Sequence, residues 1–550
     1  MKFSINRYIS FRSLMAGAAV MLLATGCTKK FEEYNTSNLA TAITLSAAYQ
    51  HIAMGVYNFS GGGDPNSYQL QQNLNADCYS GYFMSQINFN SGNNNLNYAL
   101  VGGWNGEPFK VGYLDIMRYV AVIRNMGIDK DYPGIWGIAR IIQVEAISRL
   151  TDIYGPTPYS KTGPLPAGAT GTPYDSQQDI YNLFFLQLDT ATAALKTLIA
   201  AGGVGTLPFE FPPMDLIYGG DKSTELQNWV SFANSLRLRL AMRLVKVDAV
   251  TARAQAEKAM DPANGGVITD NAQIPRVTVP SGNYSNPLAA ITINWANICI
   301  GASIQCYMTG YNDPRIGKYF DRSTDAASAG KYQGIRIGSN VGLFSYGKYS
   351  TINFKDGTVP SFNLHTPPVL MTAAEVYFLR AEAALRGWNN AGGTAQQLYE
   401  QGINTSFAQW GVTSSTYVND ATSVPDDYTD PLNAANNAAL SSKITIKWED
   451  AASDEVKLQR IITQKWIANF PEGQEAWSEF RRTGYPALFP VVQNNSGGTI
   501  SSTVQIRRLP FSQNEYNTNN AEVQKAIQLL SKPEDNGGTR LWWDVDKGNF

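Results

Sequence analysis

One helix constrains the fold of this 550-residue chain more than any other stretch. Thr372 and Glu375 have the spacing of a capping box and predict a helix that runs to Arg386. Its apolar residues form two faces, with Val376, Leu379 and Ala383 on one and Phe378, Ala381 and Leu385 on the other. A helix that buries two faces packs between other helices. The sequence therefore predicts a mainly α fold built from stacked helix pairs.

Helical periodicity bounded by capping residues, Gly and Pro recurs along the chain. It predicts further helices at residues 45–56, 111–126, 134–154, 177–199, 225–247, 252–260, 396–409, 452–469, 474–481 and 521–530. Short connections between successive helices favour antiparallel pairs. No repeat of fixed length is visible, so this prediction rests on helix pairing and on small residues.

Two long insertions, at about residues 59–107 and 261–365, lose the helical period. Both are rich in Gly, Asn and aromatic residues, and we expect irregular loops with short strands around Ile335 and Phe344. The first insertion is neither charged nor rich in proline, and long loops of that kind are more often functional than disordered. The insertions are therefore predicted to form the ligand-binding half of the molecule.

Aromatic side chains paired with amides in these insertions have the chemistry of a sugar site. An aromatic ring stacks on the apolar face of a sugar, while amides bond to its hydroxyls. For any single aromatic residue, packing inside the loop is the alternative, but two such insertions on a rigid scaffold favour a site. The candidate ligand-binding residues are Tyr82, Trp104, Asn105, Tyr284, Asn294 and Trp295.

Charge is scarce along the whole chain. Asp, Glu, Lys and Arg make up only 16% of the residues, and the formal net charge is −2. Nucleic-acid binding requires a basic field, which this composition does not supply. Many amides and aromatic residues with little charge favour a neutral polar ligand.

The N-terminus has the layout of a secretory signal. Lys2, Arg7 and Arg12 precede an apolar run at residues 14–24, which is too short for a spanning helix of about 20 residues. Small residues then lead to Cys27, as in the bacterial lipobox, although Ala24 stands where Leu is usual. We expect a signal peptide at 1–26, a tether lipidated at Cys27 over 27–44, and one folded domain at 45–550. Cleavage by ordinary signal peptidase is the alternative.

The remaining cysteines and the two histidines give weaker signals. Cys299 and Cys306 are seven residues apart, so they could pair, but buried free thiols fit the sequence equally well. Neither His51 nor His365 belongs to a cluster with zinc-ligand spacing. We therefore expect no metal site and no cofactor.

Catalysis has little support in the sequence. Glu472 and Glu475 lie near Trp477, which leaves a secreted glycosidase as an alternative, but such an enzyme needs two carboxyls facing across a cleft. Glu375 and Glu382 are better explained by a helix cap and by a partner at Arg386. Motifs of serine hydrolases, P-loop enzymes and zinc proteases are absent. We expect a protein that is not an enzyme.

Several segments, taken in order behind Cys27, resemble the SusD/RagB family of outer-membrane lipoproteins, closest to its second SusD-like branch. They are Phe31-Glu32-Glu33-Tyr34-Asn35, Asp152-Ile153-Tyr154-Gly155-Pro156-Thr157-Pro158-Tyr159-Ser160, Asn312-Asp313-Pro314-Arg315, Leu370 to Trp388, Gln464 to Pro486, and Leu541-Trp542-Trp543-Asp544. Each segment is weak alone, and their shared order is specific.

The resemblance implies a scaffold of four tetratricopeptide-like helix pairs and a loop-rich half that carries the ligand site. It implies a non-catalytic, surface-exposed, lipid-anchored protein that binds an oligosaccharide, or a peptide, and delivers it to a SusC-like TonB-dependent transporter. It assigns ion-pair and loop-fixing roles to Asp313, Arg315, Arg481 and Arg482. A glycosidase, a peptide-binding lipoprotein and an adhesin are the alternatives.

Overall fold

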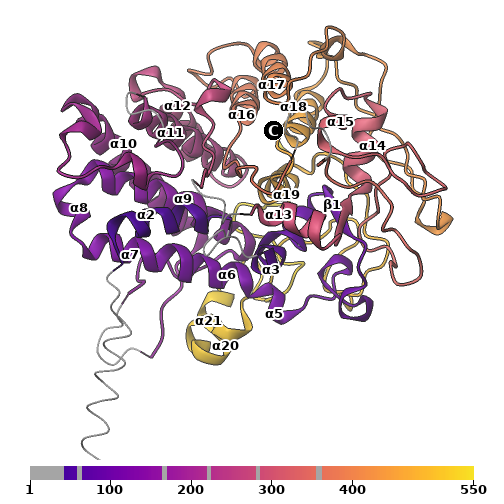
Figure 1. The fold of residues 1–550 in the computed structure, drawn as a ribbon, viewed down its shortest axis with the longest axis horizontal. Coiled ribbons are helices and arrows are strands. Elements are labelled where there is room, and N and C mark those ends of the chain that lie inside the picture. Colours follow the sequence, from indigo (N-terminus) through magenta and orange to yellow (C-terminus); the bar gives the residue numbers. More distant parts are fainter. Residues whose placement is uncertain (1–42, 58–64, 164–169, 220–223, 280–284, 355–361) are drawn as a thin grey trace, which may run out of the picture.

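Long helices fill one half of the molecule, and loops with short helices fill the other (Figure 1). The computed structural model describes residues 43–57, 65–163, 170–219, 224–279, 285–354 and 362–550. The predicted signal peptide, Cys27 and most of the tether lie outside these residues. The longer helices are α2 (Leu45–Gly55), α7 (Arg118–Asn125), α9 (Pro133–Tyr154), α10 (Gln177–Ala200), α11 (Glu225–Arg243), α12 (Ala249–Met260), α16 (Ala373–Leu385), α17 (Ala395–Gln409), α18 (Asp454–Ala468) and α19 (Gly473–Thr483).

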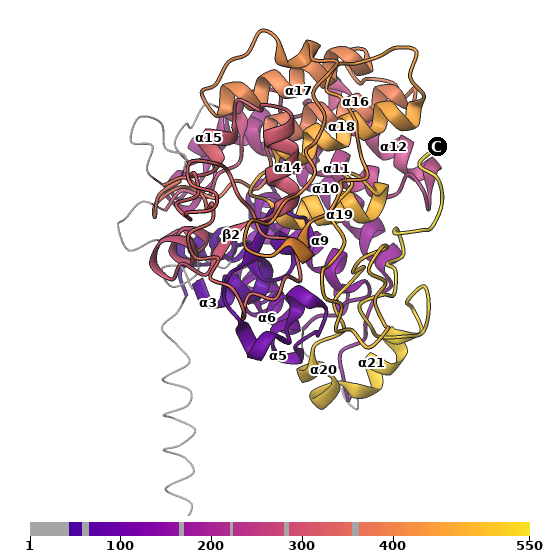
Figure 2. The same cartoon turned by 90° about the vertical axis from the view of Figure 1, so that its right-hand side faces the viewer.

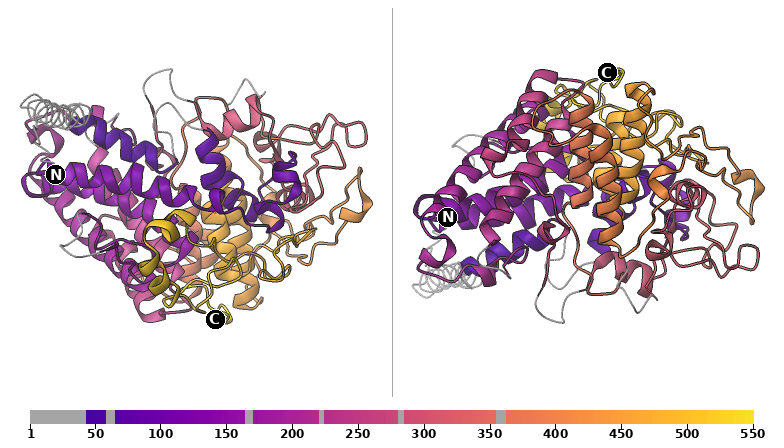
Figure 3. Two further views of the ribbon diagram at one scale, coloured as in Figure 1. Left: turned by 90° about the horizontal axis from the view of Figure 1, so that it is seen from below. Right: turned by 90° about the horizontal axis from the view of Figure 1, so that it is seen from above.

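These helices pack as neighbours in an extended array. Helix α10 contacts α9 and α11, α11 contacts α12 and α16, and α16 contacts α17 and α18. The view from above shows the array running across the molecule, with the loops at its far end (Figure 3). The mainly α fold with paired helices is confirmed. By length and composition alone α10 could cross a membrane, but here it packs between α9 and α11.

Small residues allow the close approach of α9 and α10. A Cβ added to Gly137 would lie 3.1 Å from the carbonyl oxygen of Ala191, and one added to Gly134 would lie 2.9 Å from Cβ of Leu198. Both distances are tighter than ordinary van der Waals contact, so larger side chains would separate the helices.

Local capping signals set the helix starts. Ser176 Oγ accepts from the amide of Asp179 at 3.1 Å and so caps the start of α10. At α16 the prediction is half right. Thr372 Oγ1 accepts from the Glu375 amide at 3.0 Å, but the Glu375 carboxylate binds Arg239 instead of closing the box. A buried cation competes more strongly for the carboxylate than a backbone amide does.

The loop half contains short elements. These are α3 (Pro65–Tyr68), α4 (Ala76–Tyr79), α5 (Gly102–Asn105), α6 (Glu107–Val111), α13 (Pro287–Ala289), α14 (Ala302–Gly310), α15 (Ile316–Tyr319), α20 (Gln513–Thr518), α21 (Asn520–Ile527), β1 (Phe83–Ser85) and β2 (Ile298–Ile300). The short helix α8 (Ile128–Asp131) lies in the helical half, in contact with α7 and α9. From the side, α20 and α21 lie at the opposite end from α17 (Figure 2).

The predicted strands near Ile335 and Phe344 are wrong. Ile335 makes only an isolated bridge to Gly301, and Phe344 lies in a turn. The strands β1 and β2 instead pair antiparallel, one from each insertion, with Phe83 opposite Ile300. Pairing between segments more than 200 residues apart leaves no periodic signal in strands this short.

An ion cluster lies buried where α9, α11, α16, α18 and α19 meet. Arg239 Nε and Nη2 donate to the two carboxylate oxygens of Glu375 at 2.7 and 2.8 Å. Lys465 Nζ lies 3.0 Å from Glu475. The cluster comprises Glu145, Asp152, Arg239, Arg243, Glu375, Glu382, Lys465, Glu475, Glu479 and Arg482, which are joined by a continuous set of ion pairs.

The family-derived roles of four residues are also confirmed. Arg315 Nη2 lies 2.6 Å from Asp313 Oδ2, with both side chains fully buried. Arg482 pairs with Glu382 inside the ion cluster, and Arg481 stacks over Trp477 with its guanidinium carbon 3.6 Å from the ring centroid. All four residues thus hold the scaffold and its loops.

We predict that Arg239→Met destabilises the protein by about 3–5 kcal/mol, because it leaves Glu145 buried without its cation and leaves Glu375 with only Lys465 at 3.7 Å. Denaturant unfolding measures the change. The matched control is Lys443→Met, whose pair with Asp427 is half exposed and which should cost under about 1 kcal/mol. Equal losses in the two variants would contradict a structural role for the ion cluster.

Asp77 is a buried acid outside the ion cluster, set in α4 against the first turn of α19. Gln72 Nε2 donates to its Oδ1 at 2.8 Å, and Tyr68 donates to its Oδ2 at 3.3 Å. Burial raises the pKa of Asp77 to about 7, against hydrogen bonds from Gln72 that lower it. An acid whose pKa is higher in the folded state than in the unfolded state holds its proton more tightly in the fold, which favours folding at low pH. This contribution to stability is lost as pH rises toward 7.

We predict that Asp77→Asn gains stability relative to the wild type as pH rises from 5 to 8, since the amide does not ionise. The difference in free energy of unfolding should shift by about 2 kcal/mol or more in favour of the variant. Denaturant unfolding at the two pH values measures it. A difference that does not change with pH would show that Asp77 ionises normally in the fold.

Candidate functional site

The β1–β2 pair brings two loops to the same end of the ribbon. Residues 86–94 follow β1, and residues 293–297 precede β2. Ser85 Oγ donates to the carbonyl of Asn297 at 2.6 Å, and Gln86 Nε2 donates to the carbonyl of Ala296. Cys299 Sγ donates to Gln86 Oε1 at 3.1 Å. These bonds hold the two loops together as one surface.

A third loop, residues 339–347, lies against the first. Gly342 faces Asn88, and a Cβ added there would lie 2.7 Å from Asn88 Nδ2, so the two loops are in close contact at this point. Tyr346 anchors the third loop by donating to Asp430 at 3.0 Å. A small hollow lies between the first and third loops, lined by Ile87, Asn88 and Asn340 among others, and its empty space of about 310 Å³ includes open solvent. We call loops 86–94, 293–297 and 339–347 together the aromatic face.

The aromatic face exposes apolar and amide groups. Ile87, Ile293 and Leu343 are 38%, 43% and 73% exposed. The three loops also carry half-buried aromatic rings, those of Phe89, Trp295 and Phe344. Each loop carries asparagine amides as well, and these belong to Asn88, Asn90, Asn93, Asn294 and Asn340. Exposed apolar groups gathered in one place mark an interaction site.

Charge is absent from the aromatic face. None of its residues is Asp, Glu, Lys, Arg or His. An anionic or cationic ligand would find no counter-ion there, whereas a neutral polar ligand finds amide donors and acceptors beside aromatic rings.

Three residues of the aromatic face have uncommon backbone conformations. Asn90, Ser91 and Ala296 have positive φ angles of 51°, 53° and 50°. Asn adopts this conformation readily, but Ser and Ala do so rarely. Such strain persists where the surroundings enforce it and clusters at functional sites.

Two predicted ligand residues lie on the aromatic face and a third at its edge. Trp295 is half buried and Asn294 is exposed, both in the loop before β2. Trp104 packs edge-on against Phe89 at 5.8 Å between ring centroids. These positions keep the three residues as ligand candidates.

Two other predicted residues are corrected by the structure. Tyr82 is fully buried, stacks on Trp466 at 5.3 Å and donates to its carbonyl oxygen. Asn105 is buried too, and its Oδ1 accepts from Asn95 at 2.9 Å. Both side chains have structural partners in place of a ligand. Tyr284 lies outside the described residues.

Sequence reasoning missed Ile87, Ile293, Leu343 and Asn88. In a sequence, exposed aliphatic residues look like core residues, so only aromatic and amide residues were predicted to bind the ligand. One signal was available, since each of the three loops is a charge-free run containing asparagine.

The two glutamates of the glycosidase alternative are committed to structural partners. Glu472 Oε1 accepts from Arg149 at 2.9 Å and from the amide of Gln474 at 3.0 Å. Burial alone would raise the pKa of Glu475, but Arg243 and Lys465 lower it below its ordinary value. A general acid of a glycosidase requires a raised pKa. The geometry therefore does not favour this alternative.

The cysteine thiols are unpaired and buried, and the described residues form no metal site. Cys78, Cys299 and Cys306 are free and buried, so the alternative of buried thiols is confirmed over a disulfide. Burial raises the pKa of Cys299 to about 12. Within the described part of the chain, no group of three or more His, Cys, Asp or Glu side chains could hold a metal ion.

The fold and the site together define a helical-repeat protein with a recognition face built from loops. Residues 27–544 match the model of the SusD-like family, described as SusD and RagB outer membrane lipoproteins. The chain belongs to this family, and the match begins at Cys27.

Solved structures agree with this assignment. A chitin-binding SusD homologue from Flavobacterium johnsoniae is 42% identical, with a TM-score of 0.84 over 92% of this chain and 99% of that one. A SusD homologue from Bacteroides vulgatus is 37% identical, with a TM-score of 0.84 over 94% and 100%. A SusD-like protein from Bacteroides thetaiotaomicron is 34% identical, with a TM-score of 0.80 over 91% and 99%. A search of curated protein sequences found no match.

Proposed function

We propose that this protein binds a neutral oligosaccharide at the aromatic face and does not cleave it. The observation that carries the proposal is the charge-free surface of three loops with Trp295 and asparagine amides on it. Sugar hydroxyls pair with amides, and the apolar face of a sugar ring packs on an aromatic ring. Chitin is an uncharged amide-bearing glycan, and a relative 42% identical to this chain is described as binding it. Chito-oligosaccharides are therefore the first class to test.

A peptide ligand fits the aromatic face less well. Peptides carry charged termini and usually charged side chains, which require counter-ions in a binding site. The three loops supply none. Fixed aromatic and amide groups favour a glycan instead.

We further propose that Cys27 is lipidated and that the protein acts at the cell surface beside a TonB-dependent transporter, to which it delivers the glycan. The family consists of outer membrane lipoproteins, and its model begins at this cysteine. A tether of residues 27–44 would keep the ligand-binding half close to the membrane and so close to a transporter.

We predict that the protein binds chitohexaose and that Trp295→Ala weakens binding about 30-fold or more, because buried aromatic anchors are worth about 2 kcal/mol. Isothermal titration calorimetry measures the affinity. The matched control is Trp136→Ala, which removes another half-buried Trp from α9 and should leave binding unchanged.

Two outcomes would contradict the proposal. If a panel of neutral glycans showed no binding, or if Trp295→Ala bound like the wild type, the aromatic face would not be the site. If the wild type converted the glycans to shorter ones in the same incubations, and Glu472→Gln abolished this conversion, the results would instead support the glycosidase alternative.

The anchor and the partner have their own test. We predict that the N-terminal peptide of the mature protein begins at an acylated Cys27, and that Cys27→Ser releases the protein from the outer membrane. Mass spectrometry and fractionation read these outcomes. Affinity purification from outer membranes should recover a TonB-dependent transporter; a mature N-terminus elsewhere, or recovery of the protein alone, would oppose this part of the proposal.

A further inference from the structure

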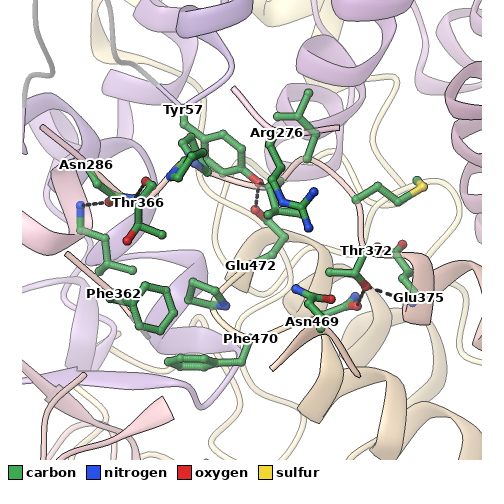
Figure 4. A pocket seen from close by; sticks show the side chains of 18 of the residues that line it. Tyr57, Arg276, Asn286, Phe362, Thr366, Thr372, Glu375, Asn469, Phe470 and Glu472 are labelled. Carbon is green, nitrogen blue, oxygen red and sulfur yellow. Dashed lines mark hydrogen bonds between the residues drawn. The ribbon is translucent and has the colours of Figure 1, made fainter. Parts of the chain in front are cut away.

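A cavity separate from the aromatic face lies at the joint between the helical half and the loop half (Figure 4). It contains about 1080 Å³ of empty space, part of it open to solvent. Its walls come from α3, the segment 366–372, the end of α17 and the link between α18 and α19. No residue of the aromatic face lines it. The enclosed part of the cavity is about 200 Å³, which is below the usual range of roughly 300–1,000 Å³ for drug-sized ligands and limits the occupant to a small compound.

The carboxylates in its wall are already paired. Glu472 accepts from Arg149 at 2.9 Å and from Tyr57, and Glu375 binds Arg239 at 2.7 Å. These acids belong to the scaffold and offer no free charge to a ligand.

Arg276, by contrast, presents a cation without an acid. Among the described residues no ion pair to a carboxylate is found for it, and its Nη1 donates to the carbonyl of Asn271 at 3.2 Å. Its position is fixed, because its backbone bridges to Val369 and the flanking Val277 amide donates to Pro368 at 3.0 Å. Figure 4 shows Arg276 across the cavity from Phe362.

Two buried polar atoms in the same wall also lack partners. Trp410 is 8% exposed, and its Nε1 has no acceptor within the described structure. Gln409 Oε1 is buried there with no donor. An unsatisfied buried polar group costs about 1–3 kcal/mol, and native proteins rarely keep one without a ligand or water. Both residues line the cavity.

Aromatic and apolar groups complete the lining. The Phe362 ring lies 5.5 Å from that of Trp410 and 6.1 Å from that of Phe470. Leu288 and Pro471 add further apolar surface. Among the described residues, the lining thus combines the guanidinium of Arg276 without a carboxylate partner, the N–H donor of Trp410 without an acceptor, and flat apolar walls.

We propose that this cavity is a second binding site, for a small ring compound that carries a carboxylate. The carboxylate pairs with Arg276, the ring lies against Phe362 and Trp410, and a polar substituent satisfies Trp410 Nε1 and Gln409 Oε1. The chemistry differs from that of the aromatic face, which has no charge to offer such a ligand.

Titration of the full chain with benzoate and with D-glucuronate tests the site, followed by ligand-observed NMR. At least one of these acids should bind saturably, and its neutral amide should bind at least tenfold more weakly. Arg276→Gln should weaken the acid at least tenfold, and Trp410→Phe, which keeps a ring but removes the N–H donor, should weaken it severalfold. Arg276→Lys, which keeps the charge, should retain most of the affinity.

Trp295→Ala is the control, and it should leave binding of the acid unchanged. Three results would overturn the proposal: no saturable binding of either acid, equal affinity for the acid and its amide, or affinity that survives Arg276→Gln. Loss of acid binding in Trp295→Ala would also overturn it, because it would place the acid on the aromatic face. Circular dichroism of Arg276→Lys and Trp410→Phe checks that the variants fold.

Discussion

The buried ion cluster is the interaction on which the rest of this structure depends. Its cations and carboxylates come from five helices, so no two of these helices can shift without separating buried charges. Isolated buried charges are very costly, and only a complete set of partners makes them tolerable. The cluster thus fixes how the helix pairs stack. It also explains why Glu375 and Glu475, which look catalytic in the sequence, serve the scaffold.

The cluster reaches the ligand-binding half through one neighbouring residue. Lys465 belongs to the cluster, and Trp466 beside it donates from Nε1 to the carbonyl of Ser80 at 2.9 Å and accepts from Tyr82. These bonds hold the segment that leads into β1, and β1 sets the position of the aromatic face. Charged side chains are thus buried together inside the scaffold, whereas the three loops of the aromatic face have none. A rigid base under strained, neutral loops suits recognition of a neutral ligand.

Local signals in the sequence predicted much of the fold. Thr372 and the helix it caps were predictable because a cap depends on four consecutive residues. Trp295 and Asn294 were found because an aromatic residue beside an amide is visible in the sequence. Tyr82 is also an aromatic residue in an insertion, but its partner Trp466 is 384 positions away. The exposure of Leu343, the cavity around Arg276 and the pairing of β1 with β2 all arise from contacts between distant segments, which periodicity and composition do not reveal.

A crystal structure of the protein with bound chitohexaose, or with whichever neutral oligosaccharide binds most tightly, tests the central claim most directly. The account predicts a sugar ring packed on Trp295, hydroxyls or acetamido groups bonded to asparagine amides of the three loops, and an unchanged helical scaffold. Sugar bound away from the aromatic face, either in the cavity of Arg276 or between the helix pairs, would contradict it.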